Sequence, residues 1–256
     1  MDVTNRFVLD FARRLASARP YATILDFGCG AGELVSAGRE ARLDLVGADV
    51  FYGGSEARLH AERSGMLGTV VHEIVDGRLP FEDGHFDLVT NNQVLEHVED
   101  LDAVLREIHR VLKPGGILLS LFPSRDVFRE GHIGIPFAHW FRAGSRARLL
   151  YTWALRSAGL GTWKQQAPTS RQWARDKLDW LDRYTRYRPR KEILAAFSRC
   201  FSNEFREVEY IRYRLRETPA LTPLAHLLDL PGGSAAATAV FRKLAFLVVV
   251  STKENR

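Results

Sequence analysis

Short apolar runs alternate with helical patterns through the first half of the chain, and this alternation limits the possible folds more than any other feature. Runs typical of buried strands lie at 24–27, 44–48, 70–75, 86–90 and 117–122, and helical patterns lie at 33–41 and 101–112. Strands joined by helices predict an α/β fold with a doubly wound, mostly parallel sheet. Right-handed connections then bring the carboxyl ends of the strands to one edge, where ligands bind.

The last part of the chain is expected to complete this sheet. It contains a helical pattern at 191–201, a strand-like alternation at 207–215 and an apolar run at 244–251. Counting the last two as strands gives a seven-stranded sheet. The final apolar run is far shorter than the roughly 18 residues that a membrane span needs, so we expect a buried strand there.

The first strand leads into a glycine-rich turn flanked by acids. Gly28, Gly30 and Gly32 alternate with other residues, Asp26 precedes them and Glu33 follows. A dinucleotide fold has the pattern G-x-G-x-x-G, whereas here Glu33 replaces the last glycine. A phosphate at the start of the following helix would meet two carboxylates, but a ligand with an ammonium group would be attracted by them. The loop therefore favours a cationic ligand without phosphate over a dinucleotide.

Polar residues also end the next three strands. Asp49 follows the second strand, Asp76 the third and Asn91 the fourth. An acid at that place after the second strand is suited to binding ribose hydroxyls. Asp49 alone could be a solvated strand end or a helix cap, but the convergence of the three residues predicts a binding site at this edge.

Four motifs in order resemble a known family. They are ILDFGCGAG (24–32), VGADV (46–50), VDGRLPFEDGHFDLVTNNQVLEHVED (75–100) and LREIHRVLKPGGILLSLFPS (105–124). Over about residues 20–124 the chain is similar to class I S-adenosylmethionine-dependent methyltransferases, nearest to the ubiquinone/menaquinone-biosynthesis type. The resemblance implies a Rossmann-like fold, methyltransferase activity and S-adenosylmethionine as the cofactor.

The resemblance also implies which residues bind the cofactor. Asp26 and the loop with Gly28, Gly30 and Gly32 would face its methionine moiety. The other assignments run from ribose to sulfonium: Asp49 at the ribose hydroxyls, Val50 or Phe51 on the adenine, Asp76 with the Gly77 amide at the adenine amino edge, and Asn91 beside the sulfonium.

A basic, tryptophan-rich segment separates the two parts of the predicted core, 1–124 and 191–256. All five tryptophans lie between 125 and 191, where 12 arginines and 3 lysines stand against 5 acids, a net charge of +10 in a chain whose total is +5. We expect 125–190 to be an inserted helical lid that recognises the substrate. Three alternatives are a helical subdomain with its own tryptophan core, contact with an anionic membrane surface, and nucleic-acid binding, which the acidic remainder makes unlikely.

Three histidines are candidates for the base that a hydroxyl acceptor needs. His97 follows the fourth strand, and His132 and His139 begin the inserted segment. Each has a purely structural alternative. No group of acids and histidines has the spacing of a dedicated metal site, and no metal is predicted, although a magnesium held partly by the substrate stays open.

The composition of the inserted segment suggests the acceptor. Tryptophan faces suit sugar rings and arginines suit anionic groups, so we expect O-methylation of a saccharide, a glycolipid or a related small molecule. The alternatives are a C- or N-acceptor of the quinone type and a cofactor-binding interaction protein without catalysis.

The remaining features concern the compartment. Cys29 and Cys200 form no disulfide framework, which suits a reducing environment, and the first residues lack the pattern of a signal peptide. We therefore expect a cytoplasmic protein, and the sequence assigns no oligomeric state.

Overall fold

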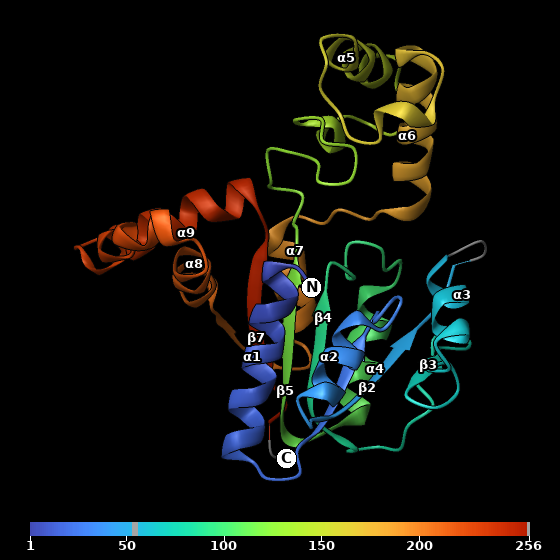
Figure 1. Ribbon diagram of the computed structural model, residues 1–256. Helices are drawn as coiled ribbons and strands as arrows, with labels where there is room; N and C mark the ends of the chain where they lie inside the picture. Colours follow the sequence, from blue (N-terminus) through green and yellow to red (C-terminus); the bar gives the residue numbers. More distant parts are fainter. Residues whose placement is uncertain (53–55, 255–256) are drawn as a thin grey trace.

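A seven-stranded sheet with the order β3-β2-β1-β4-β5-β7-β6 forms the centre of the protein (Figure 1). The computed structural model describes residues 1–52 and 56–254. The strands are β1 Thr23–Phe27, β2 Asp44–Asp49, β3 Val71–Glu73, β4 Phe86–Asn92, β5 Leu112–Phe122, β6 Ser202–Phe205 and β7 Leu247–Thr252. Within the described residues only β7 runs antiparallel to its neighbours β5 and β6. The predicted α/β, mostly parallel, Rossmann-like fold is confirmed.

Helices cover both faces of this sheet. The α-helices are α1 Val3–Ala18, α2 Glu33–Glu40, α3 Glu56–Arg63, α4 Leu101–Val111, α5 Arg146–Ser157, α6 Ser170–Tyr184, α7 Arg190–Phe197, α8 Glu207–Arg216 and α9 Gly233–Leu244. Three 3₁₀ helices are η1 Ala138–Trp140, η2 Lys164–Gln166 and η3 Pro219–Asp229. Leu105 of α4 and Phe197 of α7 pack on one face, and Phe7 of α1 and Val35 of α2 pack on the other.

The strand predicted at 207–215 is wrong. These residues form α8, and the sixth strand is the shorter β6 just before it. Tyr210 and Tyr213, three residues apart, both place their rings edge-on against Phe7 of α1, with centroids 5.1 and 5.3 Å away. Residues three apart lie on the same side of a helix. The sequence of 207–215 is compatible with a strand or a helix, and packing against α1 selects the helix.

Other boundaries shift for similar reasons. The run predicted as a strand from 244 begins as a strand only at Leu247, because Leu244 still belongs to α9. The third strand is reduced from the predicted 70–75 to Val71–Glu73. Of the 191–256 part predicted as core, Asn255 and Arg256 lie outside the described residues.

Residues between β5 and α7 form a helical unit above the upper edge of the sheet in Figure 1, where β4 ends. Helices α5 and α6 belong to it, and it has its own hydrophobic cluster around Ile135, Trp173 and Leu178. Trp173 is buried, whereas the other tryptophans are at least 37% exposed. One tryptophan therefore forms a core, as the structural alternative expected, and four remain on the surface.

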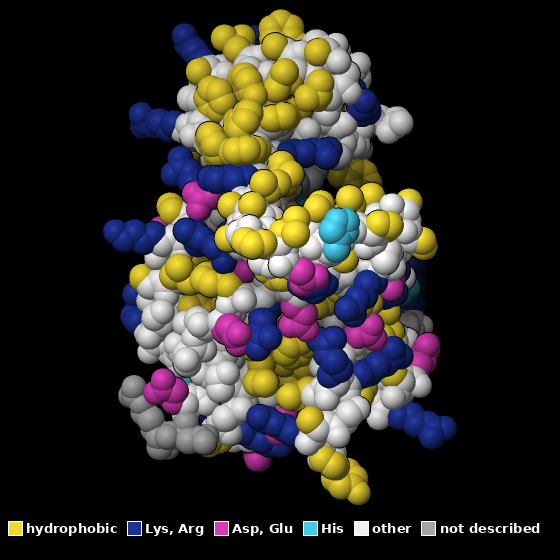
Figure 2. Space-filling model, turned by 90° about the vertical axis from the view of Figure 1, so that its left-hand side faces the viewer, with side chains coloured by type: hydrophobic (Ala, Val, Ile, Leu, Met, Phe, Trp, Pro, Cys, Tyr) yellow, Lys and Arg dark blue, Asp and Glu magenta, His cyan; other side chains and the backbone are white. Residues whose placement is uncertain are grey.

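A second projection lies between β6 and β7 and consists of α8, η3 and α9 (Figure 1). Leu221, Leu224 and Leu227 of η3 are exposed at the three-residue spacing that places side chains on one side of a 3₁₀ helix. Figure 2 shows hydrophobic side chains on this side of the molecule, interspersed with lysines and arginines. Among the described helices, none is long and apolar enough to cross a membrane.

Candidate functional site

The glycine loop leaves β1 at the edge of the sheet where the parallel strands end. Gly28, Gly30 and Gly32 all have positive φ (77°, 53° and 81°), a conformation that disfavours other residues. A Cβ on Gly28 would lie 2.4 Å from Val94 Cγ2, so packing requires this glycine. A Cβ on Gly30 would meet nothing within 4 Å. The loop is thus packed against the protein at Gly28 and open at Gly30.

Asp49, at the end of β2, fixes this loop. Its Oδ2 accepts the backbone N–H of Gly30 at 2.8 Å, and its Oδ1 accepts the N–H of Phe51 at 2.9 Å. Each carboxylate oxygen has a further lone pair, so Asp49 retains the capacity to accept a ligand's hydroxyl. The first and second strands are joined by this acid at the place where their carboxyl ends meet.

Asp26 is buried beneath the loop. Its Oδ1 accepts the hydroxyl of Thr90 on β4 at 3.1 Å. Burial raises its pKa to about 7; the Thr90 hydrogen bond opposes this, and the charge of Asp49 adds to it. A positively charged ligand group would favour ionised Asp26, and the described residues offer it no ion pair.

The second acid beside the glycines is engaged by the chain itself. Glu33 forms an ion pair with the amino group of Met1 at 2.8 Å and accepts from Asn5 Nδ2 at 3.0 Å. The side-chain oxygen Oδ1 of Asn5 accepts from Asn92 Nδ2 at 2.9 Å, so α1, α2 and β4 are connected. Asn92 was not predicted, although it follows Asn91 in the same motif, and its buried Oδ1 has no partner in the described residues.

The residues assigned to adenine lie in different environments. Val50 is 43% exposed, whereas Phe51, with φ 44°, is buried in the hydrophobic cluster that contains Ala61. Asp76 and Gly77 are exposed in the turn after β3. Val50 is therefore the more accessible of the two apolar candidates.

Asn91 lies inside the sheet. Its side chain is fully buried and donates from Nδ2 to Ser120 Oγ of β5 at 2.9 Å. The structure thus places it between two strands rather than on an exposed surface, and its assignment beside the sulfonium remains a prediction.

Two of the three predicted histidines meet. His97 follows β4, His132 begins the inserted segment, and their ring centroids are 5.0 Å apart. Glu96 lies with them, so that one ligand atom from each of the three residues is within 4.8 Å of the others. The sequence predicted no metal site because Glu96 and His97 are adjacent while His132 comes much later in the chain.

A buried hydrogen-bond network around Glu130 holds the His132 ring in place. His132 Nδ1 lies 2.8 Å from Glu130 Oε1, which also accepts the Tyr187 hydroxyl at 2.5 Å. Glu130 Oε2 accepts the N–H of Ile133 at 2.6 Å. Burial alone would lower the pKa of His132, but the hydrogen bond and charge of Glu130 raise it above its ordinary value. Glu130 and Tyr187 were not predicted from the sequence, in which only the close spacing of Glu130 and His132 indicates this network.

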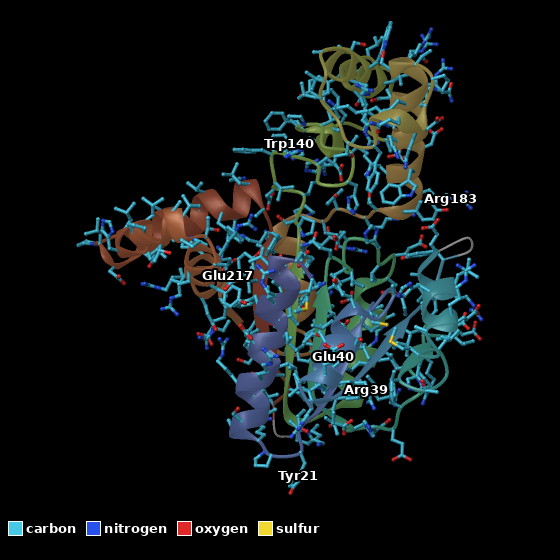
Figure 3. The ribbon with its side chains drawn as sticks, in the orientation of Figure 1. Tyr21, Arg39, Glu40, Trp140, Arg183 and Glu217 are labelled. Carbon is cyan, nitrogen blue, oxygen red and sulfur yellow. The ribbon has the colours of Figure 1, made fainter. Side chains whose placement is uncertain are left out.

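Tyr52 lies between the end of β2 and the inserted unit. Burial raises the pKa of its hydroxyl, and the negative charges of Asp49 and Glu96 raise it further. Its ring meets that of Tyr184 at 5.8 Å, at the end of α6. Figure 3 shows the neighbouring Arg183 at the lower end of α6, on the side of the sheet where α3 lies. The inserted unit therefore contacts the region beside β2.

His139 stands apart from the other two histidines. It is buried, its Nε2 donates to the Arg125 carbonyl at 3.2 Å, and burial lowers its pKa. Its ring packs on Tyr187 with centroids 4.9 Å apart. The geometry supports a structural role for His139 within the inserted unit better than a catalytic one.

Several arginines of the inserted segment bind the protein itself. Arg148 is buried and pairs with Asp182, and Arg188 donates to the carbonyls of Val98 and Glu99. Arg186 likewise donates to nearby backbone carbonyls. These three arginines are therefore occupied by structural contacts, whereas the guanidinium of Arg183 lies over the Tyr184 ring at 5.3 Å.

A cavity of about 650 Å³ lies elsewhere, between the end of β5 and α9. Ser124, Arg190, Thr238 and Arg242 are among its lining residues. None of the predicted site residues lines it, so it is separate from the site at the glycine loop.

Residues 25–120 match the family described as Methyltransferase domain. Over these residues the chain is similar to methyltransferase domains. This confirms the family resemblance predicted from the four motifs. The match covers the glycine loop, Asp49, Glu96 and His97, and it ends before the inserted segment with His132.

Curated relatives match the same half of the chain. A ubiquinone biosynthesis O-methyltransferase from Ruegeria pomeroyi is 38% identical over 127 residues, which cover 48% of this chain and 51% of that protein. A ubiquinone/menaquinone biosynthesis C-methyltransferase, UbiE, from Vibrio vulnificus is 36% identical over 135 residues, 48% of each. The chain thus spans about half the length of the curated relatives it matches.

Solved structures extend the likeness of the fold to nearly the whole chain. An S-adenosylmethionine-dependent methyltransferase from Mesorhizobium loti has a TM-score of 0.53 at 21% identity, covering 96% of this chain and 100% of that chain. The [4+2]-cyclase SpnF has a TM-score of 0.50 at 21% identity, covering 98% and 82%. Because one of these proteins is named a cyclase, the fold alone does not determine the reaction.

Proposed function

We propose that this chain is an S-adenosylmethionine-dependent methyltransferase that acts on a hydroxyl group of a small ring compound. The observation that carries the proposal is the loop 28–32, open at Gly30 and fixed by Asp49, within a matched methyltransferase domain. Asp26 supplies a buried carboxylate for a cationic ligand, and Asp49 supplies acceptors for hydroxyls.

The transfer itself is an in-line displacement. A lone pair of the acceptor oxygen forms the new bond to the methyl carbon, while the carbon–sulfur bond breaks and its electrons neutralise the sulfonium. The hydroxyl proton must leave, and in the metal-free protein His132 is the best-placed base because Glu130 orients it and raises its pKa. Positioning of the two reactants supplies most of the remaining rate.

Aromatic rings around the histidines favour a flat acceptor. Trp180 lies 5.2 Å from the His132 ring and 5.6 Å from the Tyr184 ring, and Tyr184 meets Tyr52. Such side chains suit an aromatic or quinol ring, the acceptor class suggested by the names of the ubiquinone-biosynthesis relatives. We infer that the inserted unit, 125–190, acts as the acceptor-recognition lid.

The saccharide acceptor expected from tryptophan and arginine content remains a second candidate. Trp180 lies beside the histidines, but Trp173 forms a core and Arg186 and Arg188 bind backbone carbonyls. Arg186 and Arg188 are therefore engaged by the protein itself, and Arg183, over the Tyr184 ring at 5.3 Å, is left for the anionic group of a glycolipid. This distribution favours the aromatic hydroxyl over the saccharide.

A methyl-transfer assay tests the proposal. The full chain would be incubated with methyl-labelled S-adenosylmethionine and separately with a catechol, a quinol and a hexose glycolipid. We expect label in an O-methyl ether of the catechol or quinol and formation of S-adenosylhomocysteine. If the folded protein binds no S-adenosylmethionine, the proposal is wrong; if the label appears on carbon or nitrogen, the hydroxyl assignment is wrong.

A further inference from the structure

We propose that Glu96, His97 and His132 together bind a divalent transition-metal ion. The three side chains come from the loop after β4 and from the start of the inserted segment, and one ligand atom of each lies within 4.8 Å of the others. The inference deepens the proposed function: the ion's role in the reaction rests on that function, but its binding does not.

The carboxylate of Glu96 is the first reason. The side chain is 2% exposed, and neither Oε1 nor Oε2 has a hydrogen-bond partner in the described part of the chain. A buried carboxylate without partners is costly. A bound cation would satisfy both oxygens and would favour the ionised form.

The second reason is the orientation of the two imidazoles. His97 Nδ1 lies 2.7 Å from the Tyr184 carbonyl oxygen, which can only accept, so this nitrogen carries the proton. His132 Nδ1 lies 2.8 Å from Glu130 Oε1. In both rings Nδ1 is therefore engaged and the lone pair is left on Nε2. Histidines that bind metals characteristically donate their other ring N–H to a carboxylate or a backbone carbonyl in this way.

Glu130 is itself held in place, which makes the support of His132 rigid. The Ile133 N–H donates to its Oε2 at 2.6 Å, and the Tyr187 hydroxyl donates to its Oε1. A general base alone needs one oriented histidine. Here hydrogen bonds at Nδ1 orient both histidines, and the carboxylate of Glu96, without a partner in the described residues, lies beside them.

The ligand types indicate the class of ion. Two imidazoles and one carboxylate suit Zn²⁺, Mn²⁺ or Fe²⁺, whereas Mg²⁺ prefers oxygen ligands. In a tetrahedral zinc site the ligand atoms are about 3.3 Å apart, so small inward movements of the side chains are needed. Three protein ligands leave a position open for the acceptor hydroxyl. There the ion would lower the hydroxyl's pKa and its proton would pass to water, with His132 as ligand instead of base.

Cobalt titration tests binding without any assay of activity. The full chain, freed of metal by a chelator and dialysed, would be titrated with Co²⁺ while its visible absorption is followed, and the cobalt would then be displaced with Zn²⁺. We expect one ion per chain. Glu96→Gln and His132→Ala should weaken binding at least tenfold, whereas His60→Ala, which removes an exposed histidine of α3, should not. Circular dichroism would confirm that each variant is folded.

Two results would overturn the proposal. One is a folded wild-type protein without stoichiometric Co²⁺ or Zn²⁺ binding. The other is binding that Glu96→Gln and His132→Ala leave unchanged. Calorimetry with S-adenosylmethionine on the same metal-free samples separates the two proposals, because cofactor binding without metal binding would leave the proposed function intact.

Discussion

Asp49 accepts the backbone N–H of Gly30 at 2.8 Å, so the acid that ends the second strand sets the conformation of the loop that follows the first. The same carboxylate accepts the Phe51 N–H. It can therefore affect a ligand in two ways, by direct hydrogen bonds and by keeping the glycine loop in place.

Asp49→Ala should weaken S-adenosylmethionine binding by about 1.5–3 kcal/mol, because it removes charge-assisted hydrogen bonds and releases the loop. Isothermal titration calorimetry would measure the loss. Asp44→Ala is the matched control, since Asp44 is an exposed acid at the opposite end of the same strand. Equal affinity in the two variants would contradict a role for Asp49 in the site.

Asp26 makes the stability of the ligand-free protein depend on pH. Its pKa is raised from 3.8 to about 7, so the folded state keeps a proton that the unfolded chain loses. Stability from this group is therefore greatest below about pH 4 and falls as pH rises towards 7. Asp26→Asn should be more stable than the wild type at pH 8, by a few kcal/mol as an upper bound, and the difference should shrink at pH 5. Urea unfolding at both pH values would show it.

The same carboxyl predicts a pH dependence of cofactor binding. If ionised Asp26 pairs with the cationic end of S-adenosylmethionine, affinity should rise by up to about tenfold per pH unit below pH 7 and then level off. Asp26→Asn should bind more weakly and lose this slope. A wild-type affinity that does not change between about pH 5.5 and 7 would show that Asp26 does not pair with the cofactor.

The sheet edge was predictable because its residues are marked locally. The glycines with positive φ and the acids that follow consecutive strands can be recognised from their immediate sequence neighbours. The parallel topology then brings them to the same edge of the sheet. The α8 helix was not predictable in this way, because its conformation depends on the packing of its side chains against α1. Glu96, Glu130 and Tyr187 come from separate segments of the chain and meet only in the folded protein. No spacing in the sequence shows that His132 contacts His97.

Glu130→Gln tests how His132 is supported. In the metal-free protein, where His132 is the proposed base, the substitution removes the charge that raises the pKa of His132, so the rising limb of the pH–rate profile should move to lower pH and kcat should fall about 10–100-fold. Affinity for S-adenosylmethionine should not change. Asp179→Asn, an exposed acid on α6, is the control. A pH profile that does not move would show that Glu130 has only a structural role.

S-adenosylmethionine is proposed to occupy the space beside loop 28–32, where Gly30 is open. A Cβ at Gly30 meets no protein atom within 4 Å, and Gly84, at the opposite edge of the sheet, has a similar φ of 64°. Gly30→Ala and Gly84→Ala therefore introduce comparable backbone strain, but only the first places a methyl group where the ligand is proposed to lie. By calorimetry we predict one-to-one binding to the wild type and to Gly84→Ala, with at least tenfold weaker binding to Gly30→Ala. Unchanged affinity in Gly30→Ala would contradict the account.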